Sequence, residues 1–329
     1  MKILVSGITG FVGGHLLKVL REERPGAEIY GLVRPGDTAA AALGPDVRRI
    51  DAELEAARSV EAAFERVQPE AIVHLAAQSS VQHSWLDPQG TLRTNLHGLL
   101  HLLEAVRKTG LAPRVLVVGS ADEYGDAGSS PDRPLTEDAP LRPLSPYAVS
   151  KVAQGYLALQ YALAFGMPIV RTRTFPHTGP GRGEVFAESS FARQIAEIEA
   201  GLRPPILEVG NLEAVRDFSD VRDVVRAYVQ LLDRGKPGEV YNVCSGHGIR
   251  MGDLLERLLG LTGVRVEVRV ASDRLRPSDI PIQVGDPSRL REAIGWAPRF
   301  TLGDTLEALL DEWRGRVKAR LAGNGSPGS

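Results

Sequence analysis

Cysteine is nearly absent from this sequence: Cys244 stands alone among 329 residues. A lone cysteine excludes an intramolecular disulfide and any zinc site made of several thiolates. No apolar run reaches the length that crosses a membrane, and Met1–Val5 leads straight into a strand pattern instead of a signal peptide. An excess of charge is missing too, because 39 Lys and Arg oppose 41 Asp and Glu. We therefore expect a soluble, cytoplasmic protein that binds neither membrane nor nucleic acid.

The first half of the sequence alternates between strand and helix patterns. A short apolar run, Lys2–Ser6, is followed by a glycine loop and a helical pattern. Further strands are expected at Glu28–Val33, Asp46–Ile50, Ala71–Leu75, Arg114–Val118 and Pro168–Thr174. Such alternation is typical of a doubly wound parallel α/β sheet, the Rossmann fold. We expect a dinucleotide-binding domain over 1–174, rejoined by 220–245, a smaller α/β substrate-binding domain over 175–315, and a flexible tail over 316–329.

The loop Gly7-Ile-Thr-Gly10-Phe-Val-Gly13 has the glycine spacing of a dinucleotide-binding turn. Gly7 permits a tight turn, Gly10 lets the backbone approach a pyrophosphate, and Gly13 lets the helix pack close to the strand. The start of the following helix offers amide donors to the phosphates. A glycine-rich turn without a ligand has the same pattern, so the loop alone does not decide the function.

Residues at the ends of the next strands bear on the cofactor. Arg34 follows the second strand, where an NAD site would normally carry Asp or Glu, and its guanidinium suits the 2′-phosphate of NADP. An ordinary surface arginine is the alternative, so NADP is the expected cofactor and NAD the second choice. Asp51 stands where a carboxylate could reach an adenine amino group. The small residues Ala76 and Ala77 leave room for a cofactor at the carboxyl end of their strand.

Tyr147 and Lys151 are the residues that predict chemistry. They lie four apart behind Ser145 and Pro146, a helix-start signal, so one face of the helix carries both side chains. A lysine beside a phenol is expected to lower the pKa of that phenol from about 10 and to make it a proton donor or acceptor. An amphipathic helix with an incidental Tyr and Lys has the same spacing. Ser120, at a strand tip, is placed to bind a substrate oxygen.

A helix expected at Leu92–Val106 carries an apolar stripe together with His97 and His101, which lie four residues apart. This spacing formally fits a metal pair. Because no third ligand lies nearby, we expect a core or interface helix and no metal site.

In this order along the chain, the glycine loop, Ser120, Tyr147 and Lys151 resemble the extended short-chain dehydrogenase/reductase family. The resemblance spans nearly the whole chain, to about Trp313. Within the family the sequence is similar to the GDP-4-keto-6-deoxy-D-mannose reductases, which form GDP-D-rhamnose. The stretches that carry this closer resemblance are His74–Ser80, Arg173–Gly181, Val209–Phe218, Tyr241–Gly246 and Leu275–Asp279.

The resemblance implies that NAD(P)H reduces the C4 keto group of a GDP-4-keto-6-deoxy-hexose. Tyr147 would protonate the C4 oxygen, Lys151 would tune Tyr147 and hold the nicotinamide ribose, and Ser120 would polarise the carbonyl. The cofactor residues are then Gly7, Thr9, Gly10, Phe11, Val12, Gly13, Arg34, Asp51, Ala52, Leu75, Ala76, Ala77, Tyr147 and Lys151.

The resemblance also implies a binding set for the GDP-sugar. These residues are Ser79, Ser120, His177, Arg182, Asn211, Glu213, Arg216, Arg276 and Asp279. Arg216 and Arg276 would hold the diphosphate, since a guanidinium offers paired donors, and Arg182 would contact it or the cofactor more weakly. Asn211 and Glu213 would lie against the guanine. Family members commonly form homodimers through the helices expected at Leu92–Val106 and Pro146–Phe165.

Three residues depart from the pattern of the relatives. Pro176 stands where an asparagine is usual, and Asp279 stands where a longer Glu is usual, which puts one substrate contact and the ribose contact in doubt. Asp122 bears on the main alternative, a GDP-mannose 4,6-dehydratase, which needs a carboxylate two residues after the strand-tip Ser or Thr. Asp122 is one methylene shorter than the usual Glu, about 1.5 Å of reach.

A catalytic group misplaced by about 1 Å can cost about a hundredfold in rate, so the reductase is favoured over the dehydratase. Another nucleotide-sugar epimerase or reductase is a further alternative. A sensor of this fold without catalysis is the last, and such proteins commonly lack the Tyr or the Lys that this chain has.

Overall fold

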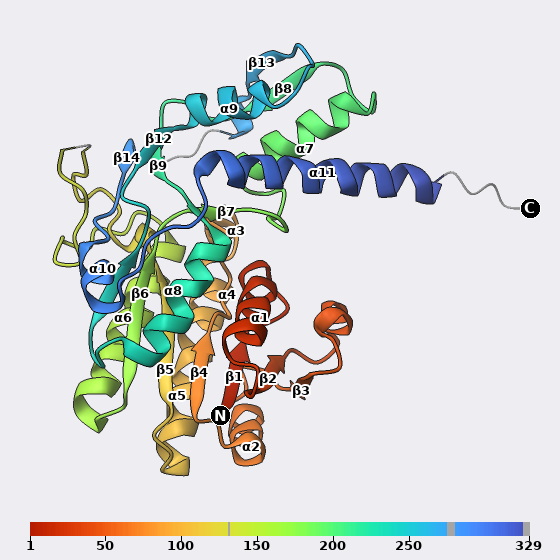
Figure 1. Ribbon diagram of the computed structural model, residues 1–329. Coiled ribbons are helices and arrows are strands. Elements are labelled where there is room, and N and C mark those ends of the chain that lie inside the picture. Colours follow the sequence, from red (N-terminus) through yellow and green to blue (C-terminus); the bar gives the residue numbers. More distant parts are fainter. Residues whose placement is uncertain (131, 275–279, 325–329) are drawn as a thin grey trace, which may run out of the picture.

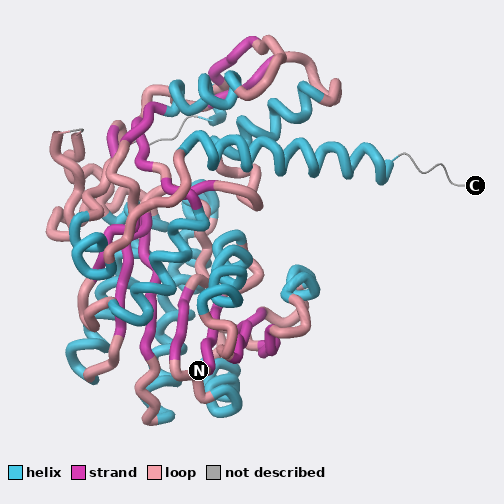
Figure 2. The backbone as a smooth tube through the Cα atoms, in the orientation of Figure 1, coloured by secondary structure: helices cyan, strands magenta, loops and turns pink. Residues whose placement is uncertain are grey.

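The computed structural model of the chain describes residues 1–130, 132–274 and 280–324. Its main feature is a seven-stranded sheet with the strand order β11-β6-β5-β4-β1-β2-β3 (Figures 1 and 2). Every neighbouring pair in this sheet is parallel. The strands are β1 (Lys2–Ser6), β2 (Glu28–Val33), β3 (Val47–Asp51), β4 (Ala71–His74), β5 (Arg114–Ser120), β6 (Ile169–Thr174) and β11 (Val240–Val243). The predicted doubly wound parallel sheet is confirmed.

Helices cover both faces of this sheet and bury one core on each. The first core holds apolar residues of α1 (Phe11–Glu23), α8 (Val221–Arg234) and α10 (Ser288–Ile294). The second core holds residues of α2 (Ala57–Val67), α5 (Gly98–Thr109) and α6 (Pro146–Phe165). Strand β1 contributes to both, with Ile3 and Val5 in the first core and Leu4 in the second, because successive side chains of a strand point to opposite faces. A strand buried on both faces reads as a continuous apolar run.

The helical run before β5 contains a π-helical turn. Helices α3 (Val81–Leu86) and α4 (Pro88–Leu92) lead into the π-helix η2 (Arg93–His97) and then into α5. The side chain of Asn95 in η2 donates to Ser150 Oγ of α6 at 2.8 Å and accepts from the Gln78 amide at 2.7 Å. Its carbonyl accepts from the side chain of Gln154 at 2.7 Å. The π turn therefore ties α6 to the loop that follows β4.

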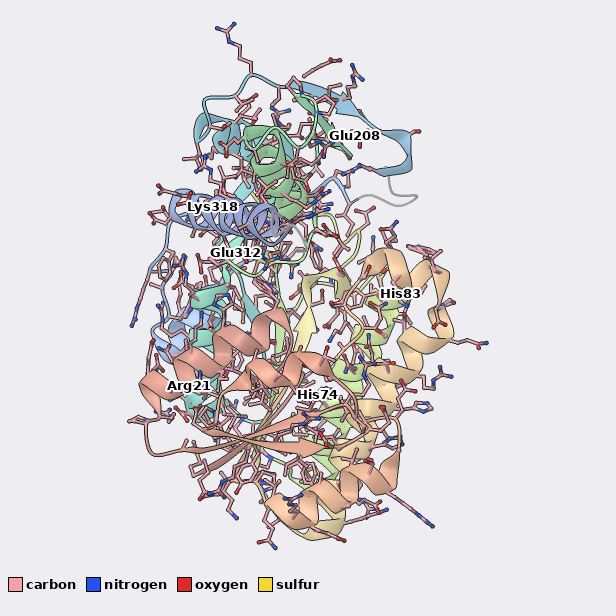
Figure 3. The ribbon with its side chains drawn as sticks, turned by 90° about the vertical axis from the view of Figure 1, so that its right-hand side faces the viewer. Arg21, His74, His83, Glu208, Glu312 and Lys318 are labelled. Carbon is pink, nitrogen blue, oxygen red and sulfur yellow. The ribbon has the colours of Figure 1, made fainter. Side chains whose placement is uncertain are left out.

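A separate core lies beyond the carboxyl ends of the main strands. It is formed by α7 (Ala187–Glu199), α9 (Met251–Gly260) and α11 (Leu302–Asn324), packed against β8 (Ile206–Val209). Strand β13 (Glu267–Val270) pairs with β8 in parallel. Figure 1 shows these elements above the sheet, and Figure 3 shows α11, with Glu312 and Lys318, between the two parts.

Short elements lie between the main sheet and the separate core. A small sheet has the order β12 (Gly248–Arg250), β9 (Val215–Asp217), β14 (Ile282–Gln283), and β10 (Ser219–Asp220) pairs with β7 (His177–Thr178). The 3₁₀ helices are η1 (Thr38–Leu43), η3 (Ala121–Glu123) and η4 (Ser272–Arg274). None of the helices in the described ranges is long and apolar enough to span a membrane.

The structure differs from the predicted tail over 316–329. Helix α11 continues to Asn324 because Val317 is buried against the third core and the Arg314 guanidinium pairs with Glu199 at 2.7 Å. Residues 325–329 of the predicted tail lie outside the described residues. The division of the chain into two domains remains a prediction.

Candidate active site

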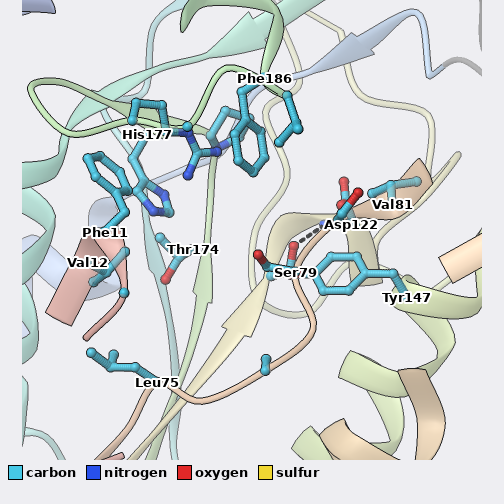
Figure 4. A pocket seen from close by; sticks show the side chains of 18 of the residues that line it. Phe11, Val12, Leu75, Ser79, Val81, Asp122, Tyr147, Thr174, His177 and Phe186 are labelled. Atoms are coloured by element: carbon cyan, nitrogen blue, oxygen red, sulfur yellow. Dashed lines mark hydrogen bonds between the residues drawn. The ribbon is translucent and has the colours of Figure 1, made fainter. Parts of the chain in front are cut away.

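A cavity of about 1390 Å³ opens at the carboxyl ends of the main strands. Its floor comes from the loops after β1 and β4 and from the ends of β5 and β6, and its roof comes from the segments around Arg182, Asn211 and Arg274. Figure 4 shows the side chains of part of this lining. Single-ligand pockets usually measure about 300–1,000 Å³. This cavity therefore has room for two ligands side by side, at the position where an open α/β sheet binds them.

The glycine loop forms one end of the cavity. Gly7 has a φ of 73°, and a Cβ on it would lie 2.7 Å from the Ala76 amide nitrogen. A Cβ on Gly13 would lie 2.4 Å from the Ile8 carbonyl oxygen, so larger residues are excluded at both positions. The loop is thus held against the sheet with its backbone facing the cavity, and the start of α1 points its amides there. This cradle fits the pyrophosphate of a dinucleotide.

Most of the predicted cofactor residues line the cavity. They are Gly7, Thr9, Gly10, Phe11, Val12, Gly13, Arg34, Ala52, Leu75, Ala76, Ala77, Tyr147 and Lys151. Asp51 is not in the set of described lining residues, and its exposed carboxylate pairs with Arg49 at 2.6 Å. Strand alternation explains the difference, because Asp51 is exposed between the buried residues Ile50 and Ala52. The placement of Asp51 does not support the predicted adenine contact.

Ser120, Tyr147 and Lys151 come together at the inner end of the cavity. Helix α6 begins where the Ser145 hydroxyl accepts from the Ala148 amide at 3.1 Å, and it carries Tyr147 and Lys151, which are 8% and 5% exposed. The phenol of Tyr147 is hydrogen-bonded to Ser120. The ammonium of Lys151 donates to the Val118 carbonyl at 2.9 Å. In Figure 4 the Tyr147 ring lies beside Asp122 and Ser79, and Phe11 and His177 lie on the opposite side of the view.

Burial sets the acid–base properties of this pair. It raises the pKa of Tyr147 well above the ordinary value, the charge of Asp122 acts in the same direction, and the bond with Ser120 opposes both. Burial also lowers the pKa of Lys151 to about 8, partly offset by the charge of Glu123. The pKa of the phenol is therefore raised, and the lowering predicted from the neighbouring lysine is wrong for these protein groups, because desolvation dominates.

A buried ion pair supports the tip of β5. The carboxylate of Glu123 accepts from the Ser120 amide at 2.9 Å, and the Ser120 hydroxyl accepts from the Asp122 amide at 3.2 Å. The same carboxylate pairs with the Arg173 guanidinium of β6 at 3.1 Å. Arg173 also donates to the Tyr124 hydroxyl at 3.1 Å. The pair therefore fixes the backbone from which Ser120 and Asp122 enter the cavity.

The predicted substrate residues divide into three groups. Ser79, Ser120, His177, Arg182, Asn211 and Arg216 line the cavity. Glu213 does not belong to the described lining of the cavity, and its exposed carboxylate pairs with Arg250 at 3.0 Å. This placement does not support a contact with the guanine base. Arg276 and Asp279 lie outside the described residues.

His177 and Arg182 are held by aromatic neighbours. The His177 ring stacks on Phe11 with an interplanar angle of 5°, and its Nδ1 donates to the Phe175 carbonyl at 3.0 Å. Burial lowers the pKa of His177 to about 4, so the ring is neutral at neutral pH. The Arg182 guanidinium lies 3.3 Å from the ring centroid of Phe186 and 3.4 Å from a Glu188 oxygen. Arg182 is thus a positioned cation in the roof of the cavity.

The loop that carries Arg182 is anchored from two sides. The Nε2 atom of His15 in α1 donates to the Pro180 carbonyl at 2.7 Å. The Gly181 amide donates to the Glu312 carboxylate of α11 at 2.9 Å. The anchors connect the glycine-loop helix and the last described helix to the same short loop.

Sequence reasoning missed several lining residues, namely Asp37, Glu188, Tyr228, Arg274 and Gln283. The Tyr228 hydroxyl bonds to Thr174 at 2.7 Å, and the Gln283 amide donates to the Ala121 carbonyl at 3.0 Å. Tyr228 and Gln283 lie outside the motif stretches, and local patterns give no signal for them. Glu188 and Arg274 lie within a few residues of Arg182 and of the stretch Leu275–Asp279, but no pattern marks them as ligands. Asp37 is the exception, because the turn Arg34-Pro-Gly-Asp37 could have been recognised.

Comparison with known proteins agrees with this geometry. Residues 4–309 match the family described as GDP-mannose 4,6 dehydratase. The chain belongs to this family, within the extended short-chain dehydrogenases/reductases.

Individual members of the family resemble the whole chain. The sequence is 35% identical to GDP-6-deoxy-D-mannose reductase of Pseudomonas aeruginosa, over 96% of this chain and 98% of the relative. It is 30% identical to GDP-mannose 4,6 dehydratase 1 of Arabidopsis thaliana, over 94% of this chain and 88% of the relative.

Two solved structures have the same fold as this chain. The structure of RMD from Pseudomonas aeruginosa complexed with NADPH has a TM-score of 0.84 at 35% identity, covering 96% of this chain and 99% of the other. The UDP-glucose 4-epimerase of Thermus thermophilus in complex with NAD has a TM-score of 0.85 at 30% identity, with coverages of 96% and 99%.

Proposed function

We propose that the protein reduces the C4 keto group of a GDP-4-keto-6-deoxy-hexose with NADPH, with NADH as the second choice, and forms GDP-D-rhamnose. The observation that carries this proposal is the meeting of Ser120, Tyr147 and Lys151 beside the glycine-loop cradle in one cavity large enough for both ligands. The similarity to GDP-6-deoxy-D-mannose reductase supports the same reaction. Because both ligands are metabolites of the cytoplasm, we place the enzyme there.

Each residue of the trio has a defined task in this reaction. When bound, the nicotinamide would supply the hydride that reaches C4. Tyr147 donates the proton to the C4 oxygen, and its raised pKa keeps the phenol neutral, the form a proton donor needs. Ser120 donates a hydrogen bond that strengthens as charge develops on that oxygen. Lys151 holds the nicotinamide ribose with its ammonium group.

The roof of the cavity supplies the groups that we assign to the nucleotide part of the GDP-sugar. We assign the diphosphate to Arg216, which lines the cavity from β9, together with the predicted Arg276. Asn211 also lines the cavity, and we assign it to the guanine base. Arg274 lines the cavity beside them, 3.6 Å from Glu208, and adds positive charge to this end.

The length of one carboxylate favours reduction over dehydration. A dehydratase needs a base for the C5 proton two residues after the strand-tip Ser, and Asp122 occupies that position on the cavity wall. Its amide donates to the Ser120 hydroxyl, which holds the backbone from which the shorter side chain extends. A base placed about 1 Å too far away costs about a hundredfold in rate.

The experiment that tests the proposed function combines two substrates. With GDP-4-keto-6-deoxy-mannose, NADPH should be consumed and NMR should show the reduced sugar. No loss of NADPH absorbance at saturating cofactor would overturn the reductase. Release of a 4-keto sugar from GDP-mannose alone would establish the dehydratase instead. The variant Asp122→Asn separates the two further, because a reductase should keep activity within about tenfold and a dehydratase should lose it.

The activity should depend on the charge of Lys151. Burial disfavours the ammonium, so the folded protein releases this proton nearer to neutral pH, at a pKa of about 8. The ammonium is present below that pH and absent above it. We therefore expect kcat/KM to fall as the pH rises through about 8, because the free enzyme's ionisations govern this constant. In Lys151→Arg, any remaining activity should show no such fall. A variant whose kcat/KM still falls near pH 8, as in the wild type, would contradict the assignment of this ionisation to Lys151.

We also propose that the protein is a homodimer. Along α6 the exposed residues Val149, Tyr156 and Leu163 repeat every seven positions, with exposed fractions of 45%, 59% and 76%. Apolar residues at heptad spacing form a seam that another helix can cover.

The double variant Tyr156→Glu/Leu163→Glu should shift the protein from dimer to monomer in light scattering. The control Leu321→Glu changes an exposed apolar residue of α11 and should leave the mass unchanged. A wild-type protein that is monomeric at high concentration would contradict the dimer.

A further inference from the structure

A tight turn after β2 places two opposite charges on one edge of the cavity. In Arg34-Pro-Gly-Asp37 the Asp37 amide donates to the Arg34 carbonyl at 3.0 Å, and Gly36 has a φ of 82°. Proline and a positive-φ glycine at the two central positions are typical of a type II turn. The turn brings the chain back on itself, so both Arg34 and Asp37 line the cavity beside the glycine loop.

The carboxylate of Asp37 is fixed against the glycine loop itself. Its Oδ2 accepts from the Thr9 hydroxyl at 2.8 Å, and its Oδ1 accepts from the Ala39 amide at 3.0 Å. These bonds, with a smaller contribution from the charge of Arg34, lower the pKa of Asp37 and keep it ionised. A carboxylate has about four acceptor positions, so it can accept further donors from a ligand. The anion is therefore built into the phosphate-binding end of the cavity.

This end of a Rossmann site receives the adenosine ribose, whose 2′ position carries a hydroxyl in NAD(H) and a phosphate in NADP(H). A carboxylate accepts a hydrogen bond from the hydroxyl and repels the phosphate, whereas an arginine attracts the phosphate. Arg34 alone predicts NADP. The structure adds Asp37 on the same edge, and the relatives themselves include a structure with NADPH and one with NAD.

We propose that Asp37 is a specificity residue for the cofactor: it holds the 2′-hydroxyl of NAD(H) and opposes the 2′-phosphate of NADP(H), so that the site binds both dinucleotides. Arg34 supplies the attraction for the phosphate, and the two side chains set the ratio of the two affinities. This inference rests on the proposed function only in requiring that the cavity binds a nicotinamide dinucleotide.

Equilibrium titrations of nicotinamide fluorescence with NADPH and NADH test the inference without turnover. Asp37→Asn removes the charge but keeps an acceptor for Thr9 and a residue suited to cap η1. It should tighten NADPH about tenfold and change NADH less than about threefold. Arg34→Ala should weaken NADPH about tenfold and leave NADH nearly unchanged. Asp37→Ser, which also keeps the cap, should tighten NADPH relative to NADH in the same way.

The matched control is Asp46→Asn, which removes one negative charge at another position of the same domain. Asp46 pairs with Arg21 at 2.6 Å and does not belong to the described lining of the cavity. The ratio of the NADPH and NADH dissociation constants is the deciding quantity. The role of Asp37 would be overturned if this ratio stayed within about twofold of wild type in both Asp37 variants, or if Asp46→Asn shifted it equally. Absence of binding of either dinucleotide to the wild-type protein would overturn the proposed function as well.

Discussion

Tyr147→Phe should lower kcat by about 10²- to 10⁴-fold while the dissociation constants of the dinucleotide and the GDP-sugar change little. The substitution removes one hydroxyl from a residue that is 8% exposed and bonded to Ser120, and the ring that packs in the cavity wall remains. The loss therefore falls on proton donation to the C4 oxygen. Single-turnover rates and equilibrium titrations on the same preparation separate the chemical step from binding.

Tyr161→Phe is the matched control for this variant. Tyr161 lies further along the same helix, its hydroxyl donates to Glu104, and neither residue belongs to the described lining of the cavity. Its turnover should stay within about threefold of wild type. If Tyr147→Phe kept the wild-type rate, the proton would have to come from Ser120 or Lys151.

Arg173→Met should destabilise the fold by about 3–5 kcal/mol, the usual effect of removing one partner of a buried ion pair. Arg173 is 7% and Glu123 is 3% exposed, so the carboxylate would remain in the interior without its opposite charge. The guanidinium bond to the Glu137 carbonyl, 2.8 Å long, would be lost as well. Urea unfolding followed by circular dichroism measures the change, and the midpoint should move without a change in slope.

The pH dependence of this variant has a defined sign. Burial raises the pKa of Glu123, and the charge of Arg173 opposes that rise. Without Arg173 the pKa of Glu123 in the folded protein lies further above its value in the unfolded chain. The free energy of unfolding therefore falls as the pH rises between these two pKa values, and it recovers at acidic pH. Arg173→Met should therefore be less destabilised at acidic pH than at neutral pH.

Two further variants control for this prediction. The double variant Arg173→Met/Glu123→Gln should recover part of the loss, since no unpaired charge remains buried. Arg269→Met removes an exposed partner of Glu267 and should change stability by less than about 1 kcal/mol. Equal losses in Arg173→Met and Arg269→Met would show that the buried pair has no special role.

The main sheet could be predicted because its signals are local. Strands such as Ala71–His74 are buried on both faces and read as apolar runs, and the glycines of the first loop are required by contacts within a few residues or with one neighbouring strand. Tyr147 and Lys151 could be recognised for the same reason, since helix geometry alone puts them on one face.

The rest of the site depends on contacts between distant segments. Sequence position suggested Asp51 and Glu213 as ligands. In the structure both side chains are exposed, and Asp51 pairs with Arg49 and Glu213 with Arg250. The direction in which the pKa of Tyr147 is shifted could not be predicted from the i+4 spacing, because it depends on the burial of the side chain. Helix α11 extends into the predicted tail because it packs on α7, which lies far away in the sequence.

The bond from the Gly181 amide to Glu312, the α11 residue labelled in Figure 3, has a consequence for biosynthesis. Among the described helices α11 is the last to leave the ribosome, and until then the Arg182 loop lacks this bond and has its contacts to His15 and Ser189. The sheet and the glycine loop can form earlier, on the nascent chain. The roof of the cavity is therefore completed late in translation, so a stalled, ribosome-bound chain would carry a cofactor cradle without a finished substrate site.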